Sequence, residues 1–415
     1  AKERAAIMRT LFELVLKNKD DLALIMTLEQ GKPLEEAKGE IAYGASYLEW
    51  YAEEGKRAYG DVIPSPAGDR RVIVTKEPVG VCAAITPWNF PSAMITRKVG
   101  AALGAGCSIV VKPAAETPYS AFALCVLAEE AGVPTGLISV VTGSSSEIGK
   151  EMTSNPIVRK LSFTGSTEVG RILMSQCSDQ IKKVSLELGG NAPFIVFNDA
   201  DLDAAVEGAM MSKYRNAGQT CVCANRIYVQ DDVYDAFAEK FVAAVNQIKV
   251  GDGTVEGVNQ GPLIDDAAVT KVQDHIADAL SKGAKVATGG QSHSLGGLFF
   301  EPTVVTEVTS DMKVAREETF GPLAPLFRFT TEDEVIQMAN NTEYGLAAYF
   351  YSRDIGRVWR VAEALEYGMV AINNGILSNE AAPFGGVKQS GIGREGAKYG
   401  LDDYMVIKYM LMGGI

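Results

Sequence analysis

The sequence predicts an α/β protein with two domains. From residue 79, short apolar runs alternate with amphipathic stretches, a pattern typical of strand–helix–strand units around a parallel sheet. One series contains VGVCAAIT, CSIVVKP, LISVVTG and KLSFTG, and a second begins after Asn191 with APFIVF. The 415 residues are enough for two or three domains. We place the boundary near residue 190, where LELGGN supplies turn residues.

The flanking segments follow other patterns. Residues 3–59 show apolar positions at spacings of three and four, which predicts helices with a break at Gly31-Lys32-Pro33. Residues 61–77 alternate in polarity, with β-branched residues in RRVIVTKEP, and predict a strand or a hairpin.

Composition excludes several classes of protein. The net charge of −13 argues against a nucleic-acid or anionic-membrane partner, since both require clustered Lys and Arg. No apolar run is long enough to span a bilayer, and AKERAAIMRT does not resemble a secretory signal.

The six cysteines do not form a disulfide pattern, so we expect a reducing, cytoplasmic setting. His275 and His293 lie in polar stretches, which argues against a histidine base, and we expect no metal site.

Two glycine-rich segments are candidates for phosphate binding. The match to G-x-G-x-x-G at residues 391–396 follows a loop rather than a strand, so we interpret it as a flexible loop. Gly165 and Ser166 follow an apolar run and open a helix, whose N-terminus favours an anion. A structural capping turn explains that segment equally well. Lys112 ends a predicted strand, where either a ligand contact or a solvated lysine is expected.

Two further side chains are candidates for catalysis. Cys221 follows a glycine-containing turn, where backbone N–H groups or a helix end would lower the pKa of its thiol. An inert core cysteine is an equal alternative on local sequence. Glu187 lies between two leucines, so desolvation should raise its pKa and suit it to act as a general base. The alternative is a carboxylate at a strand edge.

Seven motifs, in this order, resemble the aldehyde dehydrogenase superfamily. They are PWNF (87–90), VKP (111–113), FTGS (163–166), LELGG (186–190), GQTC (218–221), EETFGP (317–322) and PFGG (383–386). The segments 89–103, 214–226 and 383–400 are similar to the succinate-semialdehyde dehydrogenases in particular.

The resemblance implies a division of the chain. It gives a Rossmann-like cofactor domain from residues 1–60 and 79–190, a second α/β catalytic domain from 191–390, and a β oligomerisation arm from 61–78 and 404–415. We therefore expect a homodimer or homotetramer. Family chains usually carry further N-terminal residues, so the sequence is expected to lack the outer part of the cofactor domain.

The resemblance also implies a mechanism. Cys221 is expected to attack the aldehyde, while Asn89 and the backbone N–H of Cys221 stabilise the oxyanion, at about 3 kcal/mol for each donor. Glu187 is expected to activate the water that hydrolyses the thioester. Cys223 is a candidate for a reversible disulfide with Cys221, since so small a ring would be strained and reducible.

Family cofactor positions map onto this sequence. Glu318 is expected to hold the nicotinamide ribose. Ala115 stands where NAD-preferring members often carry Glu, so we expect NADP, with NAD as a weaker substrate; the neighbouring Glu116 is a competing carboxylate. The remaining expected contacts are Trp88, Lys112, Gly165, Ser166, Gly170, Leu188 and Phe320.

The expected substrate is succinic semialdehyde. In the similar subfamily two arginines, here Arg97 and Arg215, bind its carboxylate, and their planar forks suit that task. The loop 375–380 is expected to add a hydrogen bond from Ser378 or Asn379. A solvated helix arginine is the alternative for Arg97. Alternative functions are oxidation of another short acid semialdehyde such as glutaric semialdehyde, an acylating enzyme, and a non-catalytic family member.

Overall fold

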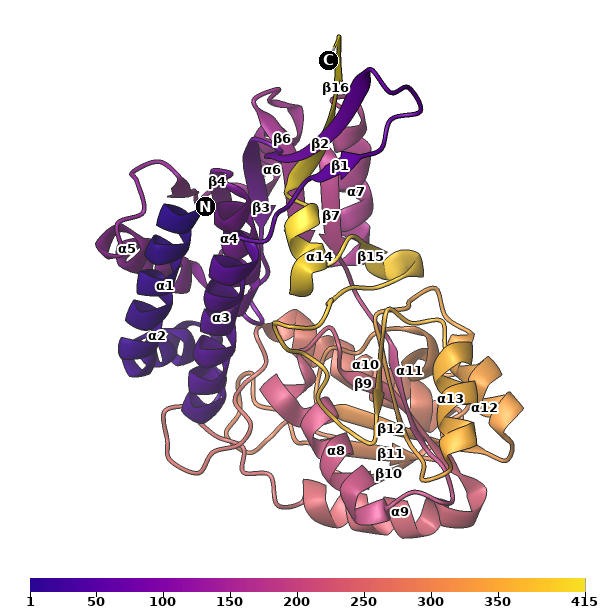
Figure 1. Ribbon diagram of the computed structural model, residues 1–415. Helices are drawn as coiled ribbons and strands as arrows, with labels where there is room; N and C mark the ends of the chain where they lie inside the picture. Colours follow the sequence, from indigo (N-terminus) through magenta and orange to yellow (C-terminus); the bar gives the residue numbers. More distant parts are fainter. Residues whose placement is uncertain (415) are drawn as a thin grey trace.

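The computed structural model describes residues 1–414, which form two α/β units and a projecting arm (Figure 1). Three helices begin the chain: α1 (Lys2–Lys17), α2 (Lys19–Gln30) and α3 (Leu34–Glu54). Helix α2 is capped after Gln30 by Gly31, whose φ of 93° is accessible to glycine without strain, and Pro33 precedes α3. The predicted break at residues 31–33 is confirmed. Apolar faces of these helices share one core with α4 (Ala93–Ala105) and β3 (Val81–Ile85).

The first α/β unit is built on a six-stranded sheet with the order β15-β7-β6-β3-β4-β5. Its strands are parallel except β15, which pairs antiparallel with β7. The strands are β3 (Val81–Ile85), β4 (Ile109–Lys112), β5 (Ile138–Val140), β6 (Val158–Thr164), β7 (Lys183–Glu187) and β15 (Gly391–Ile392). The helices are α4 (Ala93–Ala105), α5 (Pro118–Glu130), α6 (Ser145–Ser154), α7 (Thr167–Ser178) and α14 (Ala397–Asp402).

The second unit is built on a seven-stranded sheet with the order β10-β11-β12-β9-β8-β13-β14, parallel except for β10. Its strands are β8 (Ala192–Val196), β9 (Ala224–Gln230), β10 (Lys285–Thr288), β11 (Thr303–Thr306), β12 (Leu323–Phe329), β13 (Ala347–Tyr351) and β14 (Met369–Ile372). Its helices are α8 (Leu202–Tyr214), α9 (Asp231–Val245), α10 (Asp266–Ser281), α11 (Lys313–Arg316), α12 (Glu332–Asn340) and α13 (Ile355–Ala364). Two 3₁₀ turns, Arg215–Gly218 and Lys388–Ser390, complete the elements.

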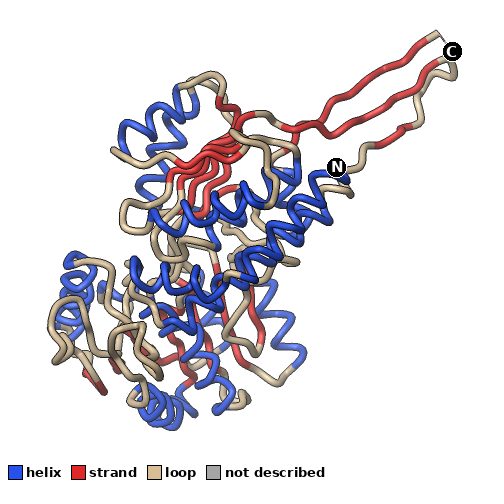
Figure 2. The backbone as a smooth tube through the Cα atoms, turned by 90° about the vertical axis from the view of Figure 1, so that its left-hand side faces the viewer, coloured by secondary structure: helices blue, strands red, loops and turns tan. Residues whose placement is uncertain are grey.

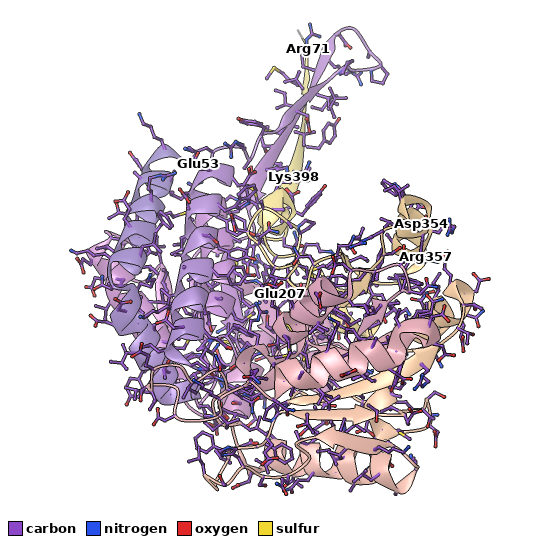
Figure 3. The ribbon with its side chains drawn as sticks, turned by 90° about the horizontal axis from the view of Figure 1, so that it is seen from below. Glu53, Arg71, Glu207, Asp354, Arg357 and Lys398 are labelled. Atoms are coloured by element: carbon purple, nitrogen blue, oxygen red, sulfur yellow. The ribbon has the colours of Figure 1, made fainter. Side chains whose placement is uncertain are left out.

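The arm is an antiparallel sheet of β1 (Asp61–Ile63), β2 (Arg70–Pro78) and β16 (Met405–Gly413). Figure 2 shows it projecting from the body, and Figure 3 labels Arg71 near its tip. The hairpin predicted for residues 61–77 is confirmed. Much of its apolar surface is exposed, including Ile407 at 74%. The last residue of the predicted arm, Ile415, lies outside the described residues.

Within residues 1–414, no helix is long and apolar enough to cross a membrane.

The loop predicted for residues 391–396 is wrong in part, because Gly391 and Ile392 form strand β15 against the end of β7. The reason is close backbone approach. A Cβ on Gly391 would lie 1.8 Å from the carbonyl oxygen of Leu186, so only glycine allows this pairing. The pairing places Gly391 opposite Glu187.

Candidate active site

Cys221 lies in the wall between two cavities. One, of about 250 Å³, is lined by side chains from α3, α4 and the loops around residues 215–222 and 378–384. The other, of about 370 Å³, lies against the ends of β6 and β7 and the segment 318–320. Cys221 and Met94 border both cavities. A thiol in this position can contact a molecule bound in either space.

The turn before Cys221 is held in an unusual backbone conformation. Asn216, Ala217 and Gly218 have φ angles of 53°, 55° and 75°. A Cβ on Gly218 would lie 2.2 Å from the carbonyl oxygen of Gly321, so glycine is required there. The Asn216 backbone N–H donates to Glu36 at 2.8 Å, and its side chain donates to the carbonyl oxygen of Gln219 at 3.2 Å. These contacts fix where the chain presents Cys221.

The lowered pKa expected for Cys221 is wrong. Burial raises the pKa of its thiol to about 12, and nearby Arg97 opposes that rise only in part. The negative charges of Glu318 and Glu187 also disfavour the thiolate. Local sequence suggested stabilising backbone N–H groups but did not reveal this enclosure by protein and carboxylates.

The side chain of Asn89 is fixed in orientation and 4% exposed. Its Oδ1 accepts the backbone N–H of Phe90 at 3.1 Å, and its Nδ2 donates to the carbonyl oxygen of Gln219 at 3.1 Å. Asn89 and Cys221 border the same 370 Å³ cavity. One amide N–H is therefore available to a group bound at that wall.

Glu187 is the last residue of β7 and is 3% exposed. Neither of its carboxylate oxygens has a hydrogen-bond partner within residues 1–414. Burial, and then the negative charge of Glu395, raises the pKa of Glu187 well above its ordinary value. The desolvation expected from its leucine neighbours is confirmed. An unpartnered buried carboxylate facing the cavity of Cys221 has the properties of a general base.

The larger cavity also carries groups suited to a dinucleotide. The rings of Trp88 and Phe320 pack edge to face, with their centroids 5.6 Å apart. The Glu318 carboxylate accepts the backbone N–H of Gly190 at 3.2 Å, and burial raises its pKa to about 7. Ser166 caps α7 by accepting the backbone N–H of Val169, so the capping turn that was the alternative for this segment is present. The expected positions that line this cavity are Trp88, Gly165, Ser166, Leu188, Glu318 and Phe320.

Three expected cofactor positions lie outside that lining. The Lys112 ammonium donates to the carbonyl oxygen of Pro113 at 3.1 Å, and Ala115 is exposed in the loop that follows. Gly170 lies under Leu188, and a Cβ there would be 2.5 Å from its Cδ2. Gly170 thus supports Leu188 by close packing.

The smaller cavity brings together Arg97, Arg215 and Ser378. The solvated alternative for Arg97 is wrong, because its side chain is 1% exposed. Its guanidinium pairs with Glu395 at 2.8 Å and lies 3.9 Å over the Phe384 ring. Arg215 lies 5.2 Å over the Phe90 ring and has no ion-pair partner among residues 1–414. Arg215 is therefore the better candidate to attract an anion.

Sequence reasoning missed the contribution of α3 and of Lys32 in the connection before it. Lys32, Glu36, Glu40 and Tyr43 line the smaller cavity. The Gly-Lys-Pro segment carries a signal for this contribution, because it places a lysine at the break between two helices.

His275 lies in a polar stretch of the sequence, but the structure buries its side chain. The residue is fully buried, with Nδ1 at 3.1 Å from Thr319 and Nε2 at 3.2 Å from Glu317. Its helix faces the segment 317–320, which the local pattern did not show.

Cys223 is buried, and its sulfur lies 3.3 Å from the Lys213 ammonium. Cys221 and Cys223 are both free thiols. A regulatory disulfide between them stays a prediction.

In the part of the chain that the structure describes, no group of three or more His, Cys, Asp or Glu side chains is arranged to hold a metal ion.

Comparisons with known proteins agree with this geometry. The chain is 68% identical over 415 residues to a glutarate-semialdehyde dehydrogenase of Pseudomonas aeruginosa, covering 100% of this chain and 86% of that protein. It is 67% identical over 413 residues to a succinate-semialdehyde dehydrogenase [NADP(+)] of Escherichia coli, again with 100% and 86% coverage. A crystal structure of a succinate-semialdehyde dehydrogenase from Burkholderia pseudomallei matches with a TM-score of 0.99 and 69% identity, covering 99% of this chain and 86% of that one.

The model of the aldehyde dehydrogenase family matches residues 1–410. With the ordered motifs, the shared fold and a thiol between two cavities, this match identifies the family. The chain belongs to the aldehyde dehydrogenase family.

Proposed function

We propose that this chain oxidises succinic semialdehyde to succinate with NADP⁺. The observation that carries the proposal is the position of Cys221 between a cavity lined by Arg215 and a cavity bordered by Glu318. Relatives named as dehydrogenases of succinic and glutaric semialdehyde support an acid semialdehyde as substrate. Glutaric semialdehyde is the second candidate, because a relative of similar identity carries that name.

The chain's own residues account for each step. The Cys221 thiol gives up its proton to solvent, and the resulting thiolate attacks the aldehyde carbon, whose oxygen becomes an oxyanion near Asn89 Nδ2 and the Cys221 backbone N–H. NADP⁺, when bound, supplies the acceptor for the hydride that leaves this carbon. A thioester on Cys221 then remains. Glu187 takes a proton from the water that attacks it, and the sulfur departs as thiolate.

The residues around the larger cavity fit a dinucleotide. Glu318 offers carboxylate oxygens to ribose hydroxyls, and the N-terminus of α7 at Ser166 favours a phosphate. The aromatic pair of Trp88 and Phe320 adds an apolar wall. These groups would hold the cofactor beside Cys221.

Substitution of Ala115 by Glu is expected to shift the cofactor preference from NADP towards NAD. A carboxylate there repels a 2′-phosphate and accepts from a free 2′-hydroxyl. We expect kcat/KM for NADP to fall about tenfold or more, which corresponds to about 1.4 kcal/mol. Steady-state kinetics with both cofactors measure this, with Ala114→Glu as the neighbouring control. A wild-type protein that strongly prefers NAD would contradict the NADP proposal.

Substitution of Arg215 by Ala is expected to raise KM for succinic semialdehyde about tenfold to a hundredfold, because a charge-assisted hydrogen bond is lost. The KM of a neutral aldehyde of similar length should change much less. Arg353→Ala is the control, since Arg353 is exposed and pairs with Asp201 on the surface. Equal effects on the charged and neutral aldehydes would exclude Arg215 as the anion site.

A panel of aldehydes tests the function as a whole. Wild-type protein is mixed with succinic, glutaric and neutral aldehydes and with NADP or NAD, and absorbance of the reduced nicotinamide is followed. We expect succinic semialdehyde with NADP to give the highest kcat/KM. A higher value for glutaric semialdehyde would favour the second candidate, and no turnover with any aldehyde would support a non-catalytic role.

We also propose the division into a cofactor domain (1–60 and 79–190), a catalytic domain (191–390) and an arm. The arm's exposed apolar side chains support assembly of the chain into a homodimer or homotetramer. The free thiols among the described residues are consistent with a reducing, cytoplasmic setting.

A further inference from the structure

Lys32 borders the smaller cavity, and its ammonium is held by protein groups on several sides. Its side chain is 1% exposed. The ammonium donates to the carbonyl oxygen of Asn89 at 2.8 Å, pairs with Glu40 and lies 4.0 Å over the Phe90 ring. An ammonium committed to a carbonyl, a carboxylate and an aromatic face has little left to offer a substrate anion.

Lys32 holds the carbonyl oxygen of Asn89, and its partner Glu40 holds the backbone at Ser92 and Ala93. The second oxygen of Glu40 accepts the backbone N–H groups of Ser92 at 2.9 Å and Ala93 at 3.1 Å, where α4 begins. The Lys32–Glu40 pair therefore fixes the chain from Asn89 to Ala93 at both ends.

The carbonyl oxygen of Asn89 is also tied to the loop that carries Cys221. Asn216 Nδ2 donates to it at 2.9 Å. Gln30 Nε2 donates to Asn216 Oδ1 at 3.0 Å, and Gln30 Oε1 accepts the backbone N–H of Lys32 at 3.0 Å. The connection between α2 and α3, the segment of Asn89 and the turn before Cys221 thus meet at one carbonyl oxygen.

We propose that Lys32 is a positioning residue that sets the amide of Asn89 against the thiol of Cys221. The inference rests on the proposed function. Asn89 Oδ1 accepts the backbone N–H of Phe90, so a shift of this backbone moves the amide relative to Gln219, whose carbonyl oxygen accepts from Asn89 Nδ2 in the loop of Cys221. A misplacement of about 1 Å can reduce a rate about a hundredfold. Lys32 thus acts through Asn89 and not by contact with the substrate.

The test is the double variant Lys32→Met, Glu40→Gln. Methionine keeps the length of the side chain, and glutamine keeps an acceptor for Ser92 and Ala93 without leaving a buried carboxylate unpaired. We expect kcat to fall about tenfold to a hundredfold, by the same factor for succinic semialdehyde and a neutral aldehyde. The KM for the cofactor should change less than about twofold, because Lys32 is not among the residues that line the larger cavity.

A double-mutant cycle separates positioning from general structure. Asn89→Ala should cost much less in the Lys32→Met, Glu40→Gln background than in wild type, because its donor is already misplaced. Additive losses would overturn the proposal, as would an unchanged kcat. A rise in KM confined to the anionic aldehyde would also overturn it, since that result would make Lys32 a substrate ligand.

Two further variants keep the experiment decisive. Lys38→Met, at a lysine on α3 paired with Glu35 near the surface, is the matched control and should retain wild-type kcat. If the double variant fails to fold, Gln30→Met decides, because it removes the link to Asn216 and leaves the ion pair intact. We expect it to lower kcat several-fold, and no change would overturn the proposal. A wild-type protein that oxidises no aldehyde would instead refute the proposed function.

Discussion

Replacement of Cys221 by alanine is expected to abolish aldehyde oxidation, with kcat falling on the order of 10⁴-fold or more. The sulfur forms the bond that holds the carbon during hydride loss and again as a thioester, and no other described thiol borders both cavities. Steady-state turnover of succinic semialdehyde with NADP measures the loss.

The control for this prediction is Cys125→Ala. Cys125 is half-buried on α5, beside a small apolar cavity of about 20 Å³, and its loss should leave kcat unchanged. Binding of NADPH, followed by its fluorescence, should persist in both variants. Residual activity of Cys221→Ala near the wild-type rate would show that the chemistry does not pass through this thiol.

Replacement of Glu187 by glutamine is expected to lower kcat about a hundredfold to ten-thousandfold, the usual range for loss of a general base. The side chain keeps its size, while the group that takes the proton from water is lost. Since Glu187 acts after hydride transfer, the first turnover should still occur. Rapid mixing should therefore show a burst of reduced nicotinamide close to the concentration of active sites, followed by a slow steady state.

The contrast with Cys221→Ala makes this result specific, because that variant should show no burst. Loss of both the burst and the steady state in Glu187→Gln would place Glu187 in the acylation half of the reaction. Glu343→Gln, on the protein surface, is the control and should behave as wild type.

The fold was predictable because its signals are local. The alternation of apolar runs and amphipathic stretches places β6 and α7 correctly, and the Gly-Lys-Pro break separates α2 from α3. The pairing of β15 with β7 was not predictable, since it depends on two strands separated by some 200 residues and on the lack of a side chain at Gly391.

The sequence predicted many of the residues that line the two cavities and the raised pKa of Glu187, but not the contribution of α3 or the raised pKa of Cys221. The order of motifs indicates which residues gather around Cys221. The pKa of that thiol, however, depends on burial by residues from several segments, and its direction was predicted wrongly. Lys32 was missed for the same reason, because its partners Glu40 and Asn89 become neighbours only when α3 packs beside α4.

The most direct test of the account is the mass of Glu187→Gln protein quenched in acid shortly after mixing with succinic semialdehyde and NADP. The account predicts a protein heavier by one succinyl group, with the addition on the peptide that contains Cys221 and removable by hydroxylamine. An unmodified protein that has nevertheless produced one equivalent of reduced nicotinamide, or a succinyl group on another residue, would contradict it.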